Sequence, residues 1–125
     1  MLRSPDSTML ALDKAEVVSL KNPPPDVADG IVSQALLAAP GLRVTLFRFA
    51  AGQELSEHTS PTRVLLHVLS GVGDFTLGQE KRRLAAGDLL HLPPNLPHAV
   101  RAVEELTFLL TQAKPPGEPK RGPAK

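Results

Sequence analysis

Apolar and polar residues alternate with a period of two along much of the chain, which is the pattern of half-buried β-strands. Residues 42–49 (LRVTLFRF) alternate in this way, and residues 73–78 (GDFTLG) place two apolar side chains on one face. Residues 63–71 (RVLLHVLSG) are apolar on both faces, so this strand requires cover on both sides. Further short strands are predicted over residues 15–20, 82–84, 89–92, 98–103 and 106–111. Short strands with a turn signal about every eight to twelve positions predict an all-β sandwich or barrel.

Residues 27–39 (VADGIVSQALLAA) fit either a helix or a strand. Gly30 would weaken the interior of a helix, and the Pro40-Gly41 pair that follows is typical of a turn. We therefore expect a strand that turns at this pair into residues 42–49. The helical alternative depends on four apolar residues near helical spacing, which are Val27, Ile31, Ala35 and Ala38.

Proline-rich segments divide the chain and set its expected organisation. Residues 21–26 (KNPPPD) predict an extended connector, because proline removes amide donors and disfavours helix in the residue before it. At 125 residues the chain is long enough for one domain with a real core. We expect an N-terminal segment over residues 1–12, one barrel domain over 13–112 and a Pro/Lys-rich tail over 113–125. The tail lacks apolar periodicity, so we expect it to be flexible and dispensable for folding.

The basic charge of the chain is concentrated in this tail, although the net charge is only +1. From residue 114 onward there are four basic residues and one acidic residue, which leaves ten basic and twelve acidic residues in the rest. The main body is therefore mildly acidic. The chain has four aromatic residues, all of them Phe, so stacking platforms for bases are scarce. A nucleic-acid partner is not expected.

The chain has no cysteine, which excludes disulfides, thiolate nucleophiles and zinc-finger sites. No apolar run approaches the length of a membrane span, and polar residues interrupt the first fourteen positions. We therefore expect a cytoplasmic protein with neither a membrane partner nor a secretion signal. The candidates for metal or proton chemistry are the four histidines, His58, His67, His91 and His98.

Two of these histidines, His58 and His98, each follow a glycine turn and lie at the edge of a strand. A single histidine of this kind is usually solvated or packed, but antiparallel pairing can bring two strand-end histidines together. The first segment reads Gly52, five residues, His58-Thr59-Ser60, three residues, Val64, six residues, Gly71. The second segment reads Gly87, five residues, Pro93-Pro94-Asn95, two residues, His98, three residues, Ala102.

These two segments resemble the two signature motifs of the cupin superfamily. The first cupin motif is Gly, five residues, His-x-His, three or four residues, Glu, six residues, Gly; the second is Gly, five residues, Pro-x-Gly, two residues, His, three residues, Asn. This chain keeps the spacing of both, and its Asn95 tolerates the left-handed conformation that the middle glycine would adopt. The resemblance covers roughly residues 13–112. It implies a small single-domain, cupin 2-like protein with an RmlC-like jelly-roll fold, a double-stranded β-helix of two antiparallel sheets.

The departures from the motifs decide which site residues the resemblance implies. In metal-binding cupins three histidines and a glutamate hold the ion, whereas here Ser60 replaces the second histidine and Val64 replaces the glutamate. His58 and His98 remain as candidate metal ligands, with His91 as a possible third. Two imidazoles make a weak site, because metal sites normally offer at least three protein ligands. If a metal binds, the expected ion is divalent Fe, Mn, Ni or Zn.

Without a metal, the same positions form a polar group inside an apolar cavity. His58, Ser60 and His98 are then the candidate ligand-binding residues. Counting by twos from the inward-facing residues of 63–71 places His67 on the outer face of the barrel wall, whereas the proline turn leaves the side of His91 open. The expected apolar lining consists of Val64, Leu66 and either Phe47 or Leu46.

The resemblance leaves three classes of function open. The first is a small-molecule pocket centred on His58 and His98, and the second is a metal-dependent enzyme of the dioxygenase or isomerase class. The third is a ligand sensor or structural module without catalysis. The chain has no phosphate-binding loop, dinucleotide fingerprint or G-x-S-x-G motif. A fold alone does not name a substrate.

The strand over residues 63–71 also predicts a homodimer. A closed barrel hides only one face of this strand, which leaves an apolar stripe of Leu65, His67 and Leu69 outside. Such a stripe is unusual on a monomer, and two-fold association would cover it.

Overall fold

The computed structural model describes residues 8–21 and 30–114, and its described part contains nine β-strands. These residues form no helix, and so none that could cross a membrane. The all-β fold expected from the sequence is confirmed. The strands are β1 (Ile31–Ala39), β2 (Leu42–Phe49), β3 (Glu54–His58), β4 (Arg63–Ser70), β5 (Val72–Leu77), β6 (Glu80–Ala85), β7 (Leu89–Leu92), β8 (His98–Ala102) and β9 (Leu106–Ala113).

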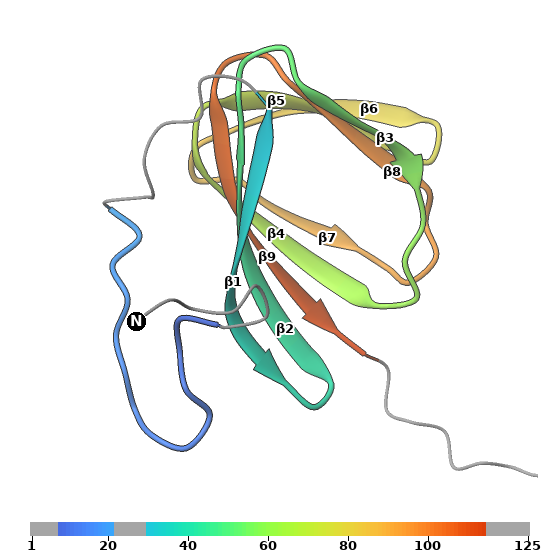
Figure 1. Cartoon of the computed structure of the whole chain (residues 1–125). Helices are drawn as coiled ribbons and strands as arrows, with labels where there is room; N and C mark the ends of the chain where they lie inside the picture. Colours follow the sequence, from blue (N-terminus) through green and yellow to red (C-terminus); the bar gives the residue numbers. More distant parts are fainter. Residues whose placement is uncertain (1–7, 22–29, 115–125) are drawn as a thin grey trace, which may run out of the picture.

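The strands form two sheets that face each other and enclose a barrel (Figure 1). The five-stranded sheet has the order β1-β2-β9-β4-β7, and the four-stranded sheet has the order β3-β8-β5-β6. Every pairing is antiparallel. Neighbours such as β2 and β9 are far apart in the sequence, so the barrel is held together by long-range pairing. This is the two-sheet jelly-roll architecture that the resemblance implied.

The segment that fitted either a helix or a strand is a strand in its described part. β1 runs antiparallel to β2 across the turn at Pro40-Gly41. Gly41 has a φ of +78°, which a glycine adopts without strain. The interpretation of Pro40-Gly41 as a turn is therefore confirmed. Residues 27–29, most of the predicted connector and residues 115–125 of the predicted tail lie outside the described residues.

The strand predicted over residues 15–20 is wrong. These residues pair with no strand of the described chain, and Val17 is 96% exposed. A β-favouring run gains little when no sheet edge is available to it. The backbone of β1, an edge strand, is contacted instead by Met9 and Leu10, whose N–H groups donate to the carbonyl oxygens of Ala35 and Leu36 at 3.3 and 2.8 Å.

The core lies between the two sheets and is centred on Phe108 of β9. Its ring lies 5.3 Å from that of Phe47, 5.6 Å from that of Phe49 and 6.2 Å from that of Phe75, measured between centroids. Phe75 belongs to the opposite sheet, so these contacts join the two layers. Such ring pairs contribute about 0.5–1.5 kcal/mol each beyond area burial. All four aromatic residues of the chain are therefore used in the core.

Alternation along β4 separates an inner face from an outer one, as the sequence predicted. Val64, Leu66 and Val68 are buried, whereas Leu65 and His67 are exposed. His67 therefore lies outside the barrel, and this prediction is confirmed.

The end of the predicted outer stripe differs from the expectation. The register of β4 with β9 shifts between Val68 and Ser70, and Leu69 at that irregularity is only half-exposed. Leu89 of β7 pairs with His67 and is 66% exposed, while Leu65 is 43% exposed. The exposed apolar stripe of the described barrel thus consists of Leu65, His67 and Leu89.

The turn from β4 into β5 requires a glycine for two reasons. Gly71 has a φ of +87°, in the left-handed region that other residues enter at a cost. A Cβ at this position would also collide with the backbone carbonyl oxygen of Glu105. The backbone before β9 therefore packs directly against this turn, at the last glycine of the first sequence segment.

Candidate functional site

His58 and His98 are brought together by the pairing of β3 with β8. Their Cα atoms are direct partners in the antiparallel register, so both side chains project from the same face of the four-stranded sheet. The ring centroids lie 4.2 Å apart, with an angle of 62° between the ring planes. The His58 side chain is exposed and that of His98 is half-buried. The two histidines therefore form one unit, although forty positions separate them in the chain.

Each imidazole is oriented by the backbone two residues before it. Nδ1 of His58 lies 2.9 Å from the carbonyl oxygen of Ser56, and Nδ1 of His98 lies 2.8 Å from that of Leu96. A carbonyl oxygen only accepts, so each Nδ1 must carry the proton and donate it. In the neutral ring Nε2 is then an acceptor. The local geometry thus gives both rings the same tautomer and leaves Nε2 able to accept a hydrogen bond or ligate an ion.

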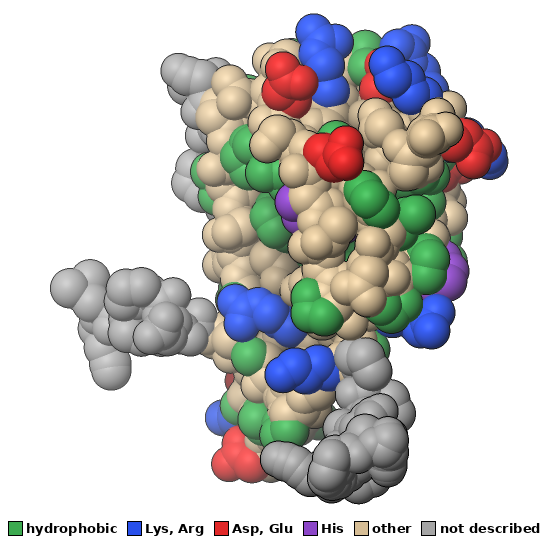
Figure 2. Space-filling model, turned by 90° about the vertical axis from the view of Figure 1, so that its right-hand side faces the viewer, with side chains coloured by type: hydrophobic (Ala, Val, Ile, Leu, Met, Phe, Trp, Pro, Cys, Tyr) green, Lys and Arg blue, Asp and Glu red, His purple; other side chains and the backbone are tan. Residues whose placement is uncertain are grey.

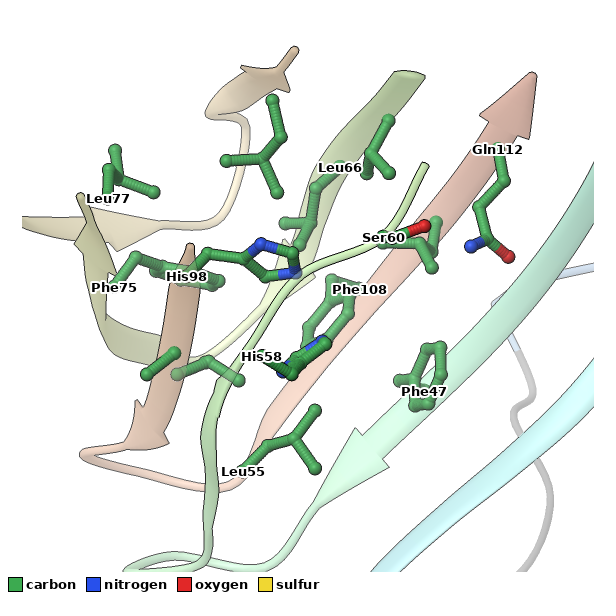
Figure 3. Close-up of a pocket in the computed structure, with 15 residues that line it drawn as sticks. Phe47, Leu55, His58, Ser60, Leu66, Phe75, Leu77, His98, Phe108 and Gln112 are labelled. Carbon is green, nitrogen blue, oxygen red and sulfur yellow. The ribbon is translucent and has the colours of Figure 1, made fainter. Parts of the chain in front are cut away.

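The two rings line a cavity of about 210 Å³ inside the barrel (Figure 3). Four of its fifteen lining residues are polar, namely His58, Ser60, His98 and Gln112, and none is a charged Asp, Glu, Lys or Arg. The remaining wall is aliphatic or aromatic and includes Leu55, Phe75 and Phe108. An apolar cavity with a few placed polar groups is the usual form of a small-molecule site.

The structure brings Ser60 to the same cavity as the two histidines and connects it to Gln112. The hydroxyl groups of Ser60 and Thr62 lie 2.7 Å apart, and Nε2 of Gln112 donates to Oγ1 of Thr62 at 3.3 Å. Figure 3 shows Ser60 and Gln112 near each other, with the two histidine rings to one side of them. A short chain of polar groups therefore leads along this wall.

The proline turn before His98 is fastened to the segment that follows His58. The N–H of Asn95 donates to the carbonyl oxygen of Ser60 at 2.7 Å, and Asn95 has a φ of +70°. The left-handed conformation expected of this Asn is therefore confirmed. Proline fixes the backbone on both sides of Asn95, so the turn is stiff. This connection holds the two histidine-bearing strand ends together.

The structure does not bring His91 to this pair, which corrects its candidacy as a third metal ligand. Leu92, its neighbour in β7, is buried in the cavity wall, so alternation places His91 on the outer face. Its Nε2 lies 2.8 Å from Nη1 of Arg63 and accepts a hydrogen bond from that guanidinium. His91 therefore lies outside the barrel, on the same outer face as its register partner Leu65.

The donor atoms at the site fall short of those that metal sites normally offer. Among residues 8–21 and 30–114, no group of three or more His, Cys, Asp or Glu side chains could hold a metal ion. Val64 occupies the motif position of the family glutamate, is 3% exposed and lines the cavity with an apolar side chain. Two imidazoles alone supply fewer protein ligands than a metal site normally has.

The structure decides one open alternative for the cavity lining and adds two residues that were not predicted. The sequence left Phe47 and Leu46 as alternatives, and Phe47 lines the cavity whereas Leu46 is buried on the other face of β2. Gln112 was not predicted, although it lies two and four residues beyond Leu110 and Phe108 and so shares their face. Leu55 was missed because β3 is exposed throughout and lacks apolar alternation.

Comparison with protein families matches residues 45–111 to the Cupin domain model. No curated protein matches the chain. The matched range contains both histidines and both glycine-led segments.

Solved structures share the fold over most of the chain. A conserved protein of unknown function from Streptococcus pyogenes is 32% identical, with a TM-score of 0.76, over 91% of this chain and 100% of that one. A cupin 2 conserved barrel domain protein from Leptotrichia buccalis is 33% identical, with a TM-score of 0.68, over 72% of this chain and 44% of that one. A cupin superfamily protein from Desulfitobacterium hafniense is 22% identical, with a TM-score of 0.76, over 87% of this chain and 100% of that one.

Proposed function

This chain belongs to the cupin family, and we propose that its barrel cavity binds a small organic molecule contacted by His58, Ser60 and His98. The observation that carries this proposal is the contact of each Nδ1 with a backbone carbonyl oxygen, at 2.9 and 2.8 Å. Each Nδ1 donates to a backbone carbonyl, so two Nε2 acceptors remain on rings that line one apolar cavity. A ligand with a hydroxyl or amide donor satisfies these acceptors, while its apolar part replaces water against the aromatic wall.

The size of the cavity limits the ligand. An apolar protein cavity of about 150 Å³ accepts benzene. The cavity here is about 210 Å³, which suits one ring or a short branched chain with a few further atoms. Larger ligands would have to extend beyond the mouth of the barrel.

Ligand binding can be tested with alanine variants of individual histidines. Small molecules that co-purify with the protein, identified by mass spectrometry, or hits from a thermal-shift screen of compounds this size, supply the ligand. We expect H58A and H98A to bind it at least about tenfold more weakly, because each removes a hydrogen bond in a desolvated site. H67A is the matched control, since His67 lies on the outer face. Unchanged affinity in both cavity variants would contradict the proposal.

A divalent ion at the same two nitrogens is a second candidate, favoured by the unprotonated Nε2 atoms. His58 and His98 would hold Fe, Mn, Ni or Zn, and the ion would supply Lewis-acid or redox chemistry of the dioxygenase or isomerase class. The absence of a carboxylate and of a third histidine limits the affinity of this site. Elemental analysis of the purified protein separates this class from a ligand-binding or structural module without a metal.

A cytoplasmic homodimer remains part of the proposal. The stripe of Leu65, His67 and Leu89 supports an interface on the outer face of the five-stranded sheet. Cell fractionation tests the location.

A further inference from the structure

A second hollow, of about 240 Å³, adjoins the cavity at one end of the barrel. It is bordered by the turn between β1 and β2, by Thr62 and by the end of β9. Gln112 lines both the cavity and this hollow, so the two spaces share a wall. The hydrogen bond from Gln112 to Thr62, and the contact of Thr62 with Ser60, follow the path from one space to the other.

Two basic residues, Arg43 and Lys114, line this hollow, and no acidic residue does. Arg43 pairs with Gln112 across β2 and β9, and alternation places it on the same face of β2 as Phe47, which lines the cavity. Lys114 directly follows β9, and its N–H donates to the carbonyl oxygen of Gly41 at 2.9 Å. Both cations are thus placed by backbone pairing on the cavity side of the barrel end.

These two cations differ from three arginines of the described barrel, which contact carboxylates. Arg48 contacts Glu105, Arg82 contacts Glu80, and Arg83 contacts Asp74, each within 3.2 Å. Within the described residues, no ion pair involves Arg43 or Lys114. Figure 2 shows Lys and Arg side chains beside Asp and Glu near the top of one face, and further Lys and Arg side chains across its lower middle. The barrel therefore has basic groups that its own carboxylates leave unneutralised.

We infer that Arg43 and Lys114 bind the anionic group of a ligand whose apolar part occupies the cavity. The ligand class is a small organic carboxylate whose aromatic or branched apolar body carries a hydroxyl group for the Nε2 atoms of the histidine pair. The inference rests on the proposed binding function and adds the charge of the ligand to it. The uncharged cavity and the hollow with its two cations suit the two parts of such a molecule. The apolar body is buried in the cavity, while the carboxylate in the hollow keeps its contact with water. A guanidinium also offers two parallel donors that fit a carboxylate.

The test compares acids with neutral amides of the same shape. The probes are 4-hydroxybenzoate, 4-hydroxyphenylacetate and 3-(4-hydroxyphenyl)propionate, each paired with its primary amide, and the measurement is isothermal titration calorimetry on the full chain. We expect the best acid to bind about threefold to tenfold more tightly than its amide at low salt, and the preference to shrink at high salt. The variant R43Q/K114Q should remove the preference without lowering Tm, because both side chains are at the exposed barrel end.

A matched control comes from Arg63, which lies at the same end of the barrel but contacts His91 on the outer face. R63Q should keep the preference for the acid. Equal binding of acid and amide to the natural chain would overturn this inference and leave the cavity proposal standing. A preference that survives in R43Q/K114Q would also overturn it. Failure of every acid and amide to bind would overturn the cavity proposal and this inference together.

Discussion

His58 and His98 are opposite each other in the pairing of β3 with β8, and their rings lie 4.2 Å apart. Each ring donates from Nδ1 to the carbonyl oxygen two residues before it, at 2.9 and 2.8 Å. The same local contact is therefore made twice, on two strands that pair. It fixes the chemical character of the cavity wall before any ligand arrives, because both rings keep Nε2 as the acceptor.

This arrangement predicts the tautomers directly. Long-range ¹H–¹⁵N spectra, recorded at a pH where both imidazoles are neutral, should show His58 and His98 protonated at Nδ1. His91 should show the same tautomer for a different reason, because its Nε2 accepts from Arg63. A cavity histidine protonated at Nε2 would mean that its backbone contact does not persist in solution. It would also contradict the acceptor role of Nε2 on which the proposed function depends.

Restoring the two missing motif residues should create a metal site. S60H/V64E supplies a third imidazole and a carboxylate at cavity-lining positions, which brings the donor set to the number that metal sites use. We expect metal content by elemental analysis to rise to about one equivalent, from a much lower value in the natural chain. S60H/L65E is the control, because Leu65 faces outward. A double variant that remains without metal would show that the cavity does not converge these side chains.

Replacing Gly71 by alanine should destabilise the barrel strongly. The residue has a φ of +87°, and a Cβ would collide with the backbone of Glu105, which no side-chain rotation relieves. We expect a loss of about 3 kcal/mol or more in the free energy of unfolding, measured with denaturant. Gly52 is the matched control, because its φ is +86° but no heavy atom lies within 4 Å of a Cβ there. G52A should cost only about 1 kcal/mol, and similar losses in the two variants would refute the role of the collision.

The ion pair of Asp74 and Arg83 should contribute to stability only above the acid range. Hydrogen bonds from Arg83 at 2.8 and 3.0 Å lower the pKa of Asp74 below its usual value, and nearby positive charges act in the same direction while burial opposes them. The contribution is therefore fully present above the unfolded-state pKa and is lost as pH falls through the lower folded-state pKa. D74N should reduce Tm by about 1–2 °C at pH 7, because exposed pairs are screened, and by less near pH 3. A Tm difference that grows on acidification would reverse the assigned sign.

The outer face of the five-stranded sheet should hold two copies together. Light scattering at micromolar concentration should give the mass of a dimer for the natural chain. Placing like charges in the stripe with L65E/L89E should yield a monomer with an intact barrel, because both side chains are exposed in one copy. L12E is the control and should remain dimeric, because Leu12 is exposed and follows Leu10, which contacts β1 at the opposite edge of the sheet from β7. A monomeric natural chain would end the dimer proposal.

Much of the fold could be predicted from the sequence, because the signals that specify it are local. Alternation set the inner and outer faces of β4, and the Pro40-Gly41 turn decided that the segment before it is a strand. A strand signal needs a partner edge as well, so the run around Val17 was predicted wrongly. The bounds of β3 were not predicted for a different reason, since each of its residues is exposed and Leu55 is its single apolar residue.

Some features of the candidate site could likewise be predicted from local sequence signals, whereas others depend on contacts between distant parts of the chain. The spacing of two glycine-led segments singled out His58 and His98, because it depends on motif positions alone. Alternation along a single strand placed His67 outside. Only the tertiary structure could settle the side of His91, because the count of residues through a proline turn depends on how the turn folds. The tertiary structure alone could also place Gln112, Arg43 and Lys114 around the second hollow, because that arrangement results from strand pairing between distant parts of the chain.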